Sequence, residues 1–132
     1  MNQFLTWKAH AALLTLAVAA LSFNGPAQAH GNTKPEHGGI VQMSGETLLE
    51  LAVKPDSVAL YVKEDDEDLP SADMVAKLTI SFKGAKTEVT LEPGAGNKFE
   101  GKGVKIAAGS KVGVMLVKKA TQSKVSANFL VE

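Results

Sequence analysis

The chain has 132 residues, and its 14 lysines balance 14 acidic residues, so it carries no net charge. It contains no arginine and no cysteine, which excludes bidentate arginine clamps for phosphate, thiolate metal sites, thiol catalysis and disulfides. The balanced charge provides neither a basic stripe for nucleic acid nor a polybasic face for a membrane surface. Only 5% of the residues are aromatic, too few for the stacking platforms that bind sugars or bases.

Residues 1–29 have the pattern of a cleaved secretory signal peptide. Lys8 supplies a positive charge, an apolar run follows, and Ala27 and Ala29 occupy the small-residue positions of a cleavage site. The apolar run is shorter than the roughly 20 residues that span a bilayer. We therefore expect export as a soluble protein without membrane insertion after cleavage, and a mature chain that begins at His30.

The segment His30–Gly39 (HGNTKPEHGG) has no hydrophobic periodicity and contains three glycines, so it is predicted to be a flexible N-terminal arm. Cleavage before His30 places a free amine and an imidazole on one residue, and together they can chelate a metal ion. His37 can add a third nitrogen, and Glu36 can add an oxygen or orient an imidazole ring. The predicted metal ligands are therefore His30, His37 and Glu36. Such nitrogen ligands suit copper, zinc and nickel, and copper has the highest affinity of the three.

The copper prediction survives a change of cleavage site. Cleavage after Ala27 would make His30 the third residue, and its imidazole would join the amine and two backbone amides in the square-planar geometry that Cu(II) and Ni(II) prefer. Cyclisation of Gln28 would block that arrangement. The plain alternative is that both histidines of the arm are solvated and bind nothing.

From Ile40 onward, apolar and polar residues alternate with a period close to two. Turns rich in glycine and proline interrupt the alternation about every 8–12 residues, which predicts seven or eight short antiparallel strands and no helix. Residues 40–132 are thus predicted to form an all-β domain, an immunoglobulin-like or CopC-like β-sandwich, with a small closed barrel as the alternative. The residues predicted to be buried are Ala76, Leu78, Ile80, Phe82, Leu91, Val114, Leu116 and Phe129.

Two other features offer metal donors. The run Glu64–Asp68 has five consecutive acids but lacks the spacing of a calcium loop; it is predicted to be a solvated turn, with weak metal collection as the alternative. Met43, Met74 and Met115 could bind Cu(I) through their thioethers, but they are scattered and are predicted to serve packing. No Ser-His-acid set, His-Glu-x-x-His motif or phosphate loop is present, which predicts that the protein is not an enzyme.

The segment Lys34–Val41 (KPEHGGIV), behind the start Ala29-His30-Gly31, resembles small uncharacterised exported proteins found alongside heavy-metal efflux systems in Gram-negative bacteria. The resemblance extends to Leu60-Tyr61-Val62 and to Gly96–Glu100. It implies a periplasmic location and a heavy-metal efflux component as a partner. A looser similarity is to CopC-type periplasmic copper carriers, which also begin with histidine and fold as β-sandwiches. Those carriers use a second histidine far along the chain, and none follows His37 here, so only His30 carries over.

The sequence therefore predicts a soluble periplasmic metal-binding protein, first of all for Cu(II), that buffers or carries the ion in heavy-metal resistance. The alternative is a β-sandwich interaction module that binds no metal and docks on an envelope or efflux protein through an exposed edge strand. A small copper redox enzyme is a third interpretation. It has little support, because the chain lacks the aromatic substrate face of the copper-dependent polysaccharide monooxygenases.

Overall fold

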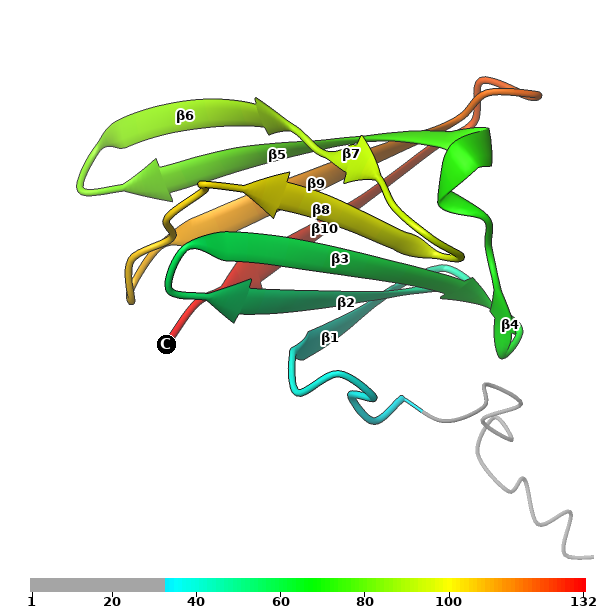
Figure 1. Cartoon of the computed structure of the whole chain (residues 1–132), viewed down its shortest axis with the longest axis horizontal. Helices are drawn as coiled ribbons and strands as arrows, with labels where there is room; N and C mark the ends of the chain where they lie inside the picture. The colour runs from blue at the N-terminus through cyan, green and yellow to red at the C-terminus, as the bar shows by residue number, and fades with distance from the viewer. Residues whose placement is uncertain (1–32) are drawn as a thin grey trace, which may run out of the picture.

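The computed structural model describes residues 33–132, which form two antiparallel β-sheets packed face to face (Figure 1). The first sheet has the strand order β1-β2-β3-β8-β7, with β4 paired to β3, and the second has the order β10-β9-β5-β6. A 3-10 turn, η1, covers Ser71–Asp73. The strands are β1 (Ile40–Ser44), β2 (Thr47–Lys54), β3 (Ser57–Glu64), β4 (Glu67–Asp68), β5 (Met74–Phe82), β6 (Ala85–Thr90), β7 (Glu92–Pro93), β8 (Lys98–Lys102), β9 (Lys111–Lys118) and β10 (Lys124–Leu130).

This architecture confirms the predicted all-β sandwich. Eight of the strands have five residues or more, within the expected seven or eight. The two others, β4 and β7, are two-residue pairings that the alternation could not reveal. Among the described residues, no helix is long and apolar enough to cross a membrane.

Tight turns set the register of the hairpins. Lys83 and Gly84 join β5 to β6 with φ angles of 47° and 81°. Positive φ at both central residues defines the type I′ turn, whose twist matches that of paired strands. Asp65 and Asp66 join β3 to β4 in the same way, with φ angles of 51° and 63°. The middle of the acidic run is therefore an exposed hairpin turn, whereas Glu64 ends β3, is half-buried and pairs with Lys118.

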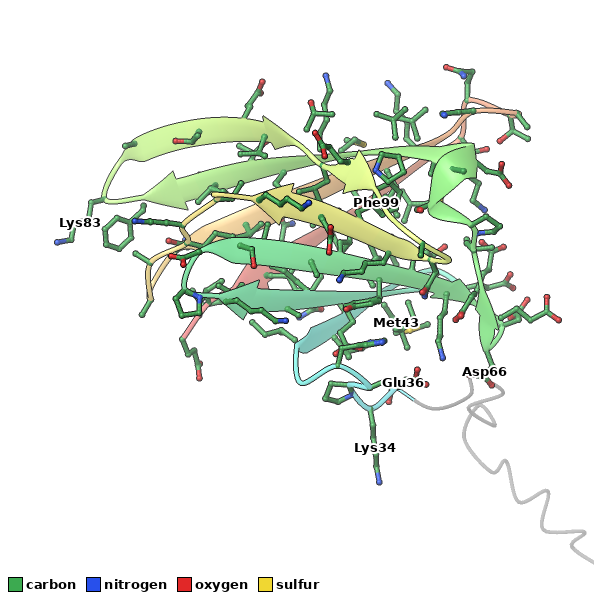
Figure 2. All side chains as sticks on the ribbon, viewed as in Figure 1. Lys34, Glu36, Met43, Asp66, Lys83 and Phe99 are labelled. Carbon is green, nitrogen blue, oxygen red and sulfur yellow. The ribbon has the colours of Figure 1, made fainter. Side chains whose placement is uncertain are left out.

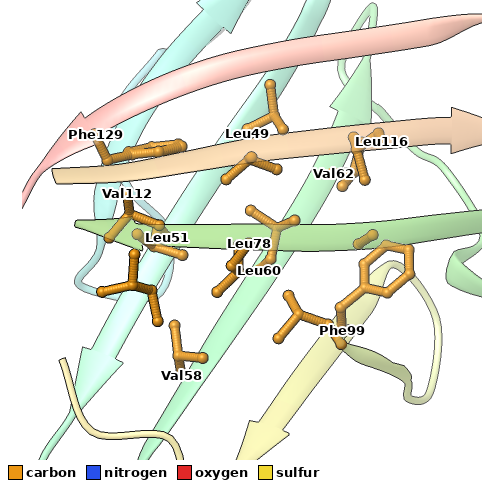
Figure 3. Packing of buried hydrophobic residues seen from close by; sticks show 14 of the residues in the cluster. Leu49, Leu51, Val58, Leu60, Val62, Leu78, Phe99, Val112, Leu116 and Phe129 are labelled. Carbon is orange, nitrogen blue, oxygen red and sulfur yellow. The ribbon is translucent and has the colours of Figure 1, made fainter. Parts of the chain in front are cut away.

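The core lies between the two sheets and is built from the inward-facing alternate residues of their strands (Figure 3). Seven of the eight residues predicted to be buried are buried: Ala76, Leu78, Ile80, Leu91, Val114, Leu116 and Phe129.

The eighth prediction, Phe82, is wrong, because this residue is only half-buried. It ends β5 at the rim of the sandwich, and the ammonium group of Lys83 lies 5.3 Å from the centre of its ring. The aromatic ring in the core of the first sheet is instead Phe99 on β8, which is fully buried.

Candidate functional site

Glu50 is a buried carboxylate on the outer face of the first sheet. Leu49 and Leu51, its neighbours on β2, are fully buried in the core, so the alternation of the strand turns Glu50 to the other face. An acid on such a face is expected in water, yet only 2% of Glu50 is exposed. The residues that hydrogen-bond to it belong to the arm that precedes β1.

The arm supplies Glu50 with a set of backbone donors. The N–H groups of Glu36 and His37 donate to Oε1 and Oε2 over 2.9 and 2.8 Å, and the N–H of Gly39 donates to Oε2 over 2.9 Å. Hydrogen bonds to an ionised acceptor are stronger than neutral ones. The stretch 36–39 is thus docked on the sheet.

The same contacts set the charge state of Glu50. Burial raises the pKa of this carboxyl, but the N–H groups of Gly39, Glu36 and His37 and the His37 side chain lower it, and the net result is a pKa below the usual glutamate value. Glu50 is therefore ionised at neutral pH and can only accept hydrogen bonds.

His37 is held between Glu50 and a tyrosine. Its Nδ1 lies 3.1 Å from Oε1 of Glu50, and its ring stacks on Tyr61 with 3.5 Å between centroids and 2° between planes. Because the ionised Glu50 can only accept, Nδ1 must carry the proton of a neutral imidazole, which leaves the lone pair on Nε2. The side chain is 36% exposed, and the structure gives Nε2 no hydrogen-bond partner among residues 33–132.

Docking of the arm requires glycine at position 39. A Cβ there would lie 2.5 Å from the backbone oxygen of Leu51 and 2.9 Å from Cγ of Glu50. We expect Gly39→Ala to lower the free energy of unfolding by about 1–2 kcal/mol, because the arm must move away from rigid backbone. Gly113→Ala is the control, since a Cβ there meets only ordinary contacts of 3.6 Å or more. Urea denaturation measures both, and equal losses would contradict close docking at Gly39.

Glu36 makes an ion pair beside this cluster. Its Oε1 lies 2.7 Å from Nζ of Lys63, which is also 3.8 Å from Asp68. The hydrogen bond with Glu36 raises the pKa of Lys63 above its usual value. Glu36 lies on the arm below the first sheet (Figure 2). To act as a metal ligand, the carboxylate of Glu36 would have to break its ion pair with Lys63, or bind Lys63 and the metal ion at the same time.

The predicted ligands divide between the described residues and the rest of the chain. His37 and Glu36 are described, whereas His30 and the predicted signal peptide lie outside the described residues. Within residues 33–132, no group of three or more histidine, aspartate or glutamate side chains is arranged to hold a metal ion. The sequence prediction assigns the further donors to His30 and its amine, which lie outside this range.

The three methionines outside the predicted signal peptide lie in different parts of the fold. Met74 is buried in the core, Met115 is exposed on the second sheet, and Met43 lies on β1 of the first sheet (Figure 2). The three thioethers are therefore not clustered, and of the predicted packing roles the one of Met74 is in the core.

The sequence analysis did not identify Glu50 or Tyr61 as residues of the candidate site. A signal for Glu50 was present, because it is the one charged residue in the apolar stretch 48–53. Tyr61 stands directly opposite Glu50 in the β2–β3 register, so the hairpin pattern could have paired the two. The return of the arm over both residues leaves no periodic signal.

The comparisons with known proteins leave this geometry as the main guide to function: no protein-family model and no curated protein matches the chain.

Proposed function

We propose that this protein is a soluble periplasmic binding protein for a transition metal ion, first of all Cu(II), that buffers or carries the ion in heavy-metal resistance. The observation that supports the proposal most is the hydrogen bond between Glu50 and Nδ1 of His37. A histidine that ligates a metal commonly gives its other ring N–H to a carboxylate, which fixes the ring and raises the basicity of the ligating nitrogen.

The surroundings of His37 favour a prepared ligand. Its ring is stacked on Tyr61 and its backbone N–H is bound by Glu50, so little freedom of the side chain remains to be lost on binding. The proposed donors are Nε2 of His37, the imidazole and free amine of His30, and an oxygen of Glu36 if its ion pair with Lys63 opens. Zinc and nickel are the alternative ions, because they also take imidazole ligands.

Tyr61 offers a direct readout of binding. It is the one tyrosine of the chain, and the one tryptophan, Trp7, lies in the predicted signal peptide. Cu(II) bound to an imidazole 3.5 Å from the phenol ring is expected to quench the tyrosine emission. The protein is purified from the periplasm of an expressing bacterium, and mass spectrometry first confirms that it begins at His30.

We expect the variants to weaken Cu(II) binding in a defined order. His30→Ala should weaken it most, because a ring nitrogen and the chelate with the amine are lost together, and one extra residue before His30 should be nearly as damaging. His37→Phe should weaken it less while keeping an aromatic ring on Tyr61. Glu50→Gln should weaken it by about 10–100-fold, the usual effect of losing the carboxylate behind a ligating histidine. Glu36→Ala should have the smallest effect.

Competition with a chelator of known affinity measures each change, and Tyr61 emission locates it. Affinity should fall as the pH is lowered, because imidazole binds metal only when deprotonated. Neutralising the acidic turn, with Asp65→Asn and Asp66→Asn, is the control and should have little effect. Equal binding by native and extended N-termini, or dependence on the acidic turn alone, would contradict the proposal and favour an interaction module that binds no metal.

A further inference from the structure

Strand β6 (Ala85–Thr90) is an uncovered edge of the second sheet. It pairs with β5 on one side only, and Figure 1 shows it as the outermost strand of its layer. All of its residues are exposed except Val89, which is half-buried. Thr87, which faces the sandwich interior, is exposed as well. An edge of this kind is a template for a further strand.

The register of the β5–β6 hairpin tells which backbone groups face outward. Hydrogen-bonded and non-hydrogen-bonded pairs alternate along an antiparallel ladder. Just beyond β6, the N–H of Leu91 donates to the backbone oxygen of Ala76 over 2.9 Å, so the odd-numbered residues bond inward to β5. The N–H and C=O groups of Lys86 and Glu88 therefore point out from the free edge.

The sequence of this edge is complementary to itself. We propose that β6 pairs antiparallel with β6 of a second copy of the chain, about a two-fold axis at Thr87. Lys86 then lies opposite Glu88 of the second copy, and Glu88 lies opposite Lys86. These are the residues whose backbone groups face outward, so each pair makes two hydrogen bonds as well as an ion pair. On the inner face, Ala85 meets Val89 and Thr87 meets Thr87.

Neighbouring registers are disfavoured by the same residues. An axis at residue 88 places Glu88 against Glu88, and an axis at residue 86 places Lys86 against Lys86; like charges directly opposite each other destabilise a strand pair. An axis between residues 87 and 88 places Thr87 of one copy opposite Glu88 of the other. The backbone groups of Glu88 point toward the second copy, but those of Thr87 point toward β5, so this pair cannot form its hydrogen bonds. Of these registers, the one centred on Thr87 satisfies both charge and backbone geometry.

The dimer would join two four-stranded sheets into one continuous sheet of eight strands. Its contact is confined to one strand of six residues from each copy, so the association should be weak and seen at high protein concentration. Because the ion pairs lie at the surface, added salt should weaken it further.

A charge exchange tests the pairing. In sedimentation velocity experiments over a concentration series up to the millimolar range, wild-type protein is expected to dimerise. Lys86→Glu or Glu88→Lys should each weaken self-association by about tenfold or more, because each places two like-charged pairs in the dimer. An equal mixture of the two variants should associate as well as wild type, because every pair is again of opposite charge. Lys124→Glu, an exposed lysine on the opposite edge strand of this sheet, is the control and should change nothing.

Restored association in the mixture also shows that both variants fold. Slowed amide exchange at Lys86 and Glu88 in the wild-type dimer would place the contact at this edge. A wild-type protein that stays monomeric at the highest concentration would overturn the proposal. So would a dimer that neither variant weakens, or single variants that lose association without recovering it when mixed.

Discussion

Replacing Phe99 with alanine is expected to lower the free energy of unfolding by about 3–5 kcal/mol, the usual cost of removing a large buried aromatic ring. Phe99 is fully buried. It stands opposite Leu60 in the pairing of β3 with β8, and its ring lies at one end of the packed side chains in Figure 3. The loss combines the transfer free energy of the ring with the cavity that rigid strands on both sides cannot fill.

Urea denaturation followed by far-UV circular dichroism measures this effect. Phe82→Ala is the matched control, because it removes the same atoms from a ring that is only half-buried, and its loss should be clearly smaller. Phe129→Ala should resemble Phe99→Ala, since Phe129 is also buried. A loss below about 1 kcal/mol at Phe99 would contradict its place in the core, where aromatic truncations cost several times more.

Glu50→Gln is expected to lower the free energy of unfolding by about 2–3 kcal/mol, although the two side chains have the same shape. Oε1 meets the N–H of Glu36 and Nδ1 of His37, and Oε2 meets the N–H groups of His37 and Gly39. In one orientation the NH2 group of the amide faces the N–H groups of His37 and Gly39. In the other it faces the N–H of Glu36 and Nδ1 of His37, which can accept only if the ring proton moves to Nε2. A buried donor left without an acceptor costs about 1–3 kcal/mol, and hydrogen bonds to a charged acceptor are worth more than neutral ones.

The pH dependence of this loss provides an internal check. The pKa of Glu50 is lower in the folded protein than the usual glutamate value. Its charged form therefore adds stability above the unfolded-state pKa, and this stability is lost as the pH falls through the folded-state pKa. The difference between wild type and Glu50→Gln should be full at neutral pH and should shrink at acidic pH below the usual glutamate range. Glu100→Gln is the control and should cost less, because Glu100 is a half-buried residue of β8 that pairs with the Lys98 side chain. A difference between wild type and Glu50→Gln that stays constant with pH would contradict the role assigned to the charge.

The hairpins were predictable because their signals are local. Alternation placed Ala76, Leu78 and Ile80 on the inner face, where they are buried, and turns rich in glycine and proline marked the ends of strands. Alternation assigns a residue to a face but not to a depth, so Phe82 was placed in the core although it lies at the rim. The burial of Phe99 was not predicted, because the alternation around it is weak. Its strand is short and mostly polar, and its burial depends on pairing with β3, which is distant in the sequence.

The residues of the candidate site also differ in whether their signal is local or depends on contacts between distant segments. His37 and Glu36 stood out because histidine is rare in this chain, with three copies in all, and because Glu36 is its neighbour. Glu50 and Tyr61 become neighbours of His37 only when the arm folds back over β2 and β3. The contact depends on three backbone N–H groups, which every residue except proline possesses. The side chains that do bear on the contact, the absent one of Gly39 and the lone charge of Glu50, do not tell which segment of the chain folds over the sheet.

The hydrogen bonds between the arm and Glu50 extend the packed structure to residues before the first strand. Judged by its strands, the domain begins at Ile40. A fragment cut at that residue would keep every strand but would lose Glu36, His37 and Gly39, which hold the Glu50 carboxylate. In that fragment water would have to replace the three backbone donors, and the contacts of the arm with the sheet would be lost. We therefore expect that fragment to be less stable than a chain that includes Glu36, because residues 36–39 are packed on the sheet.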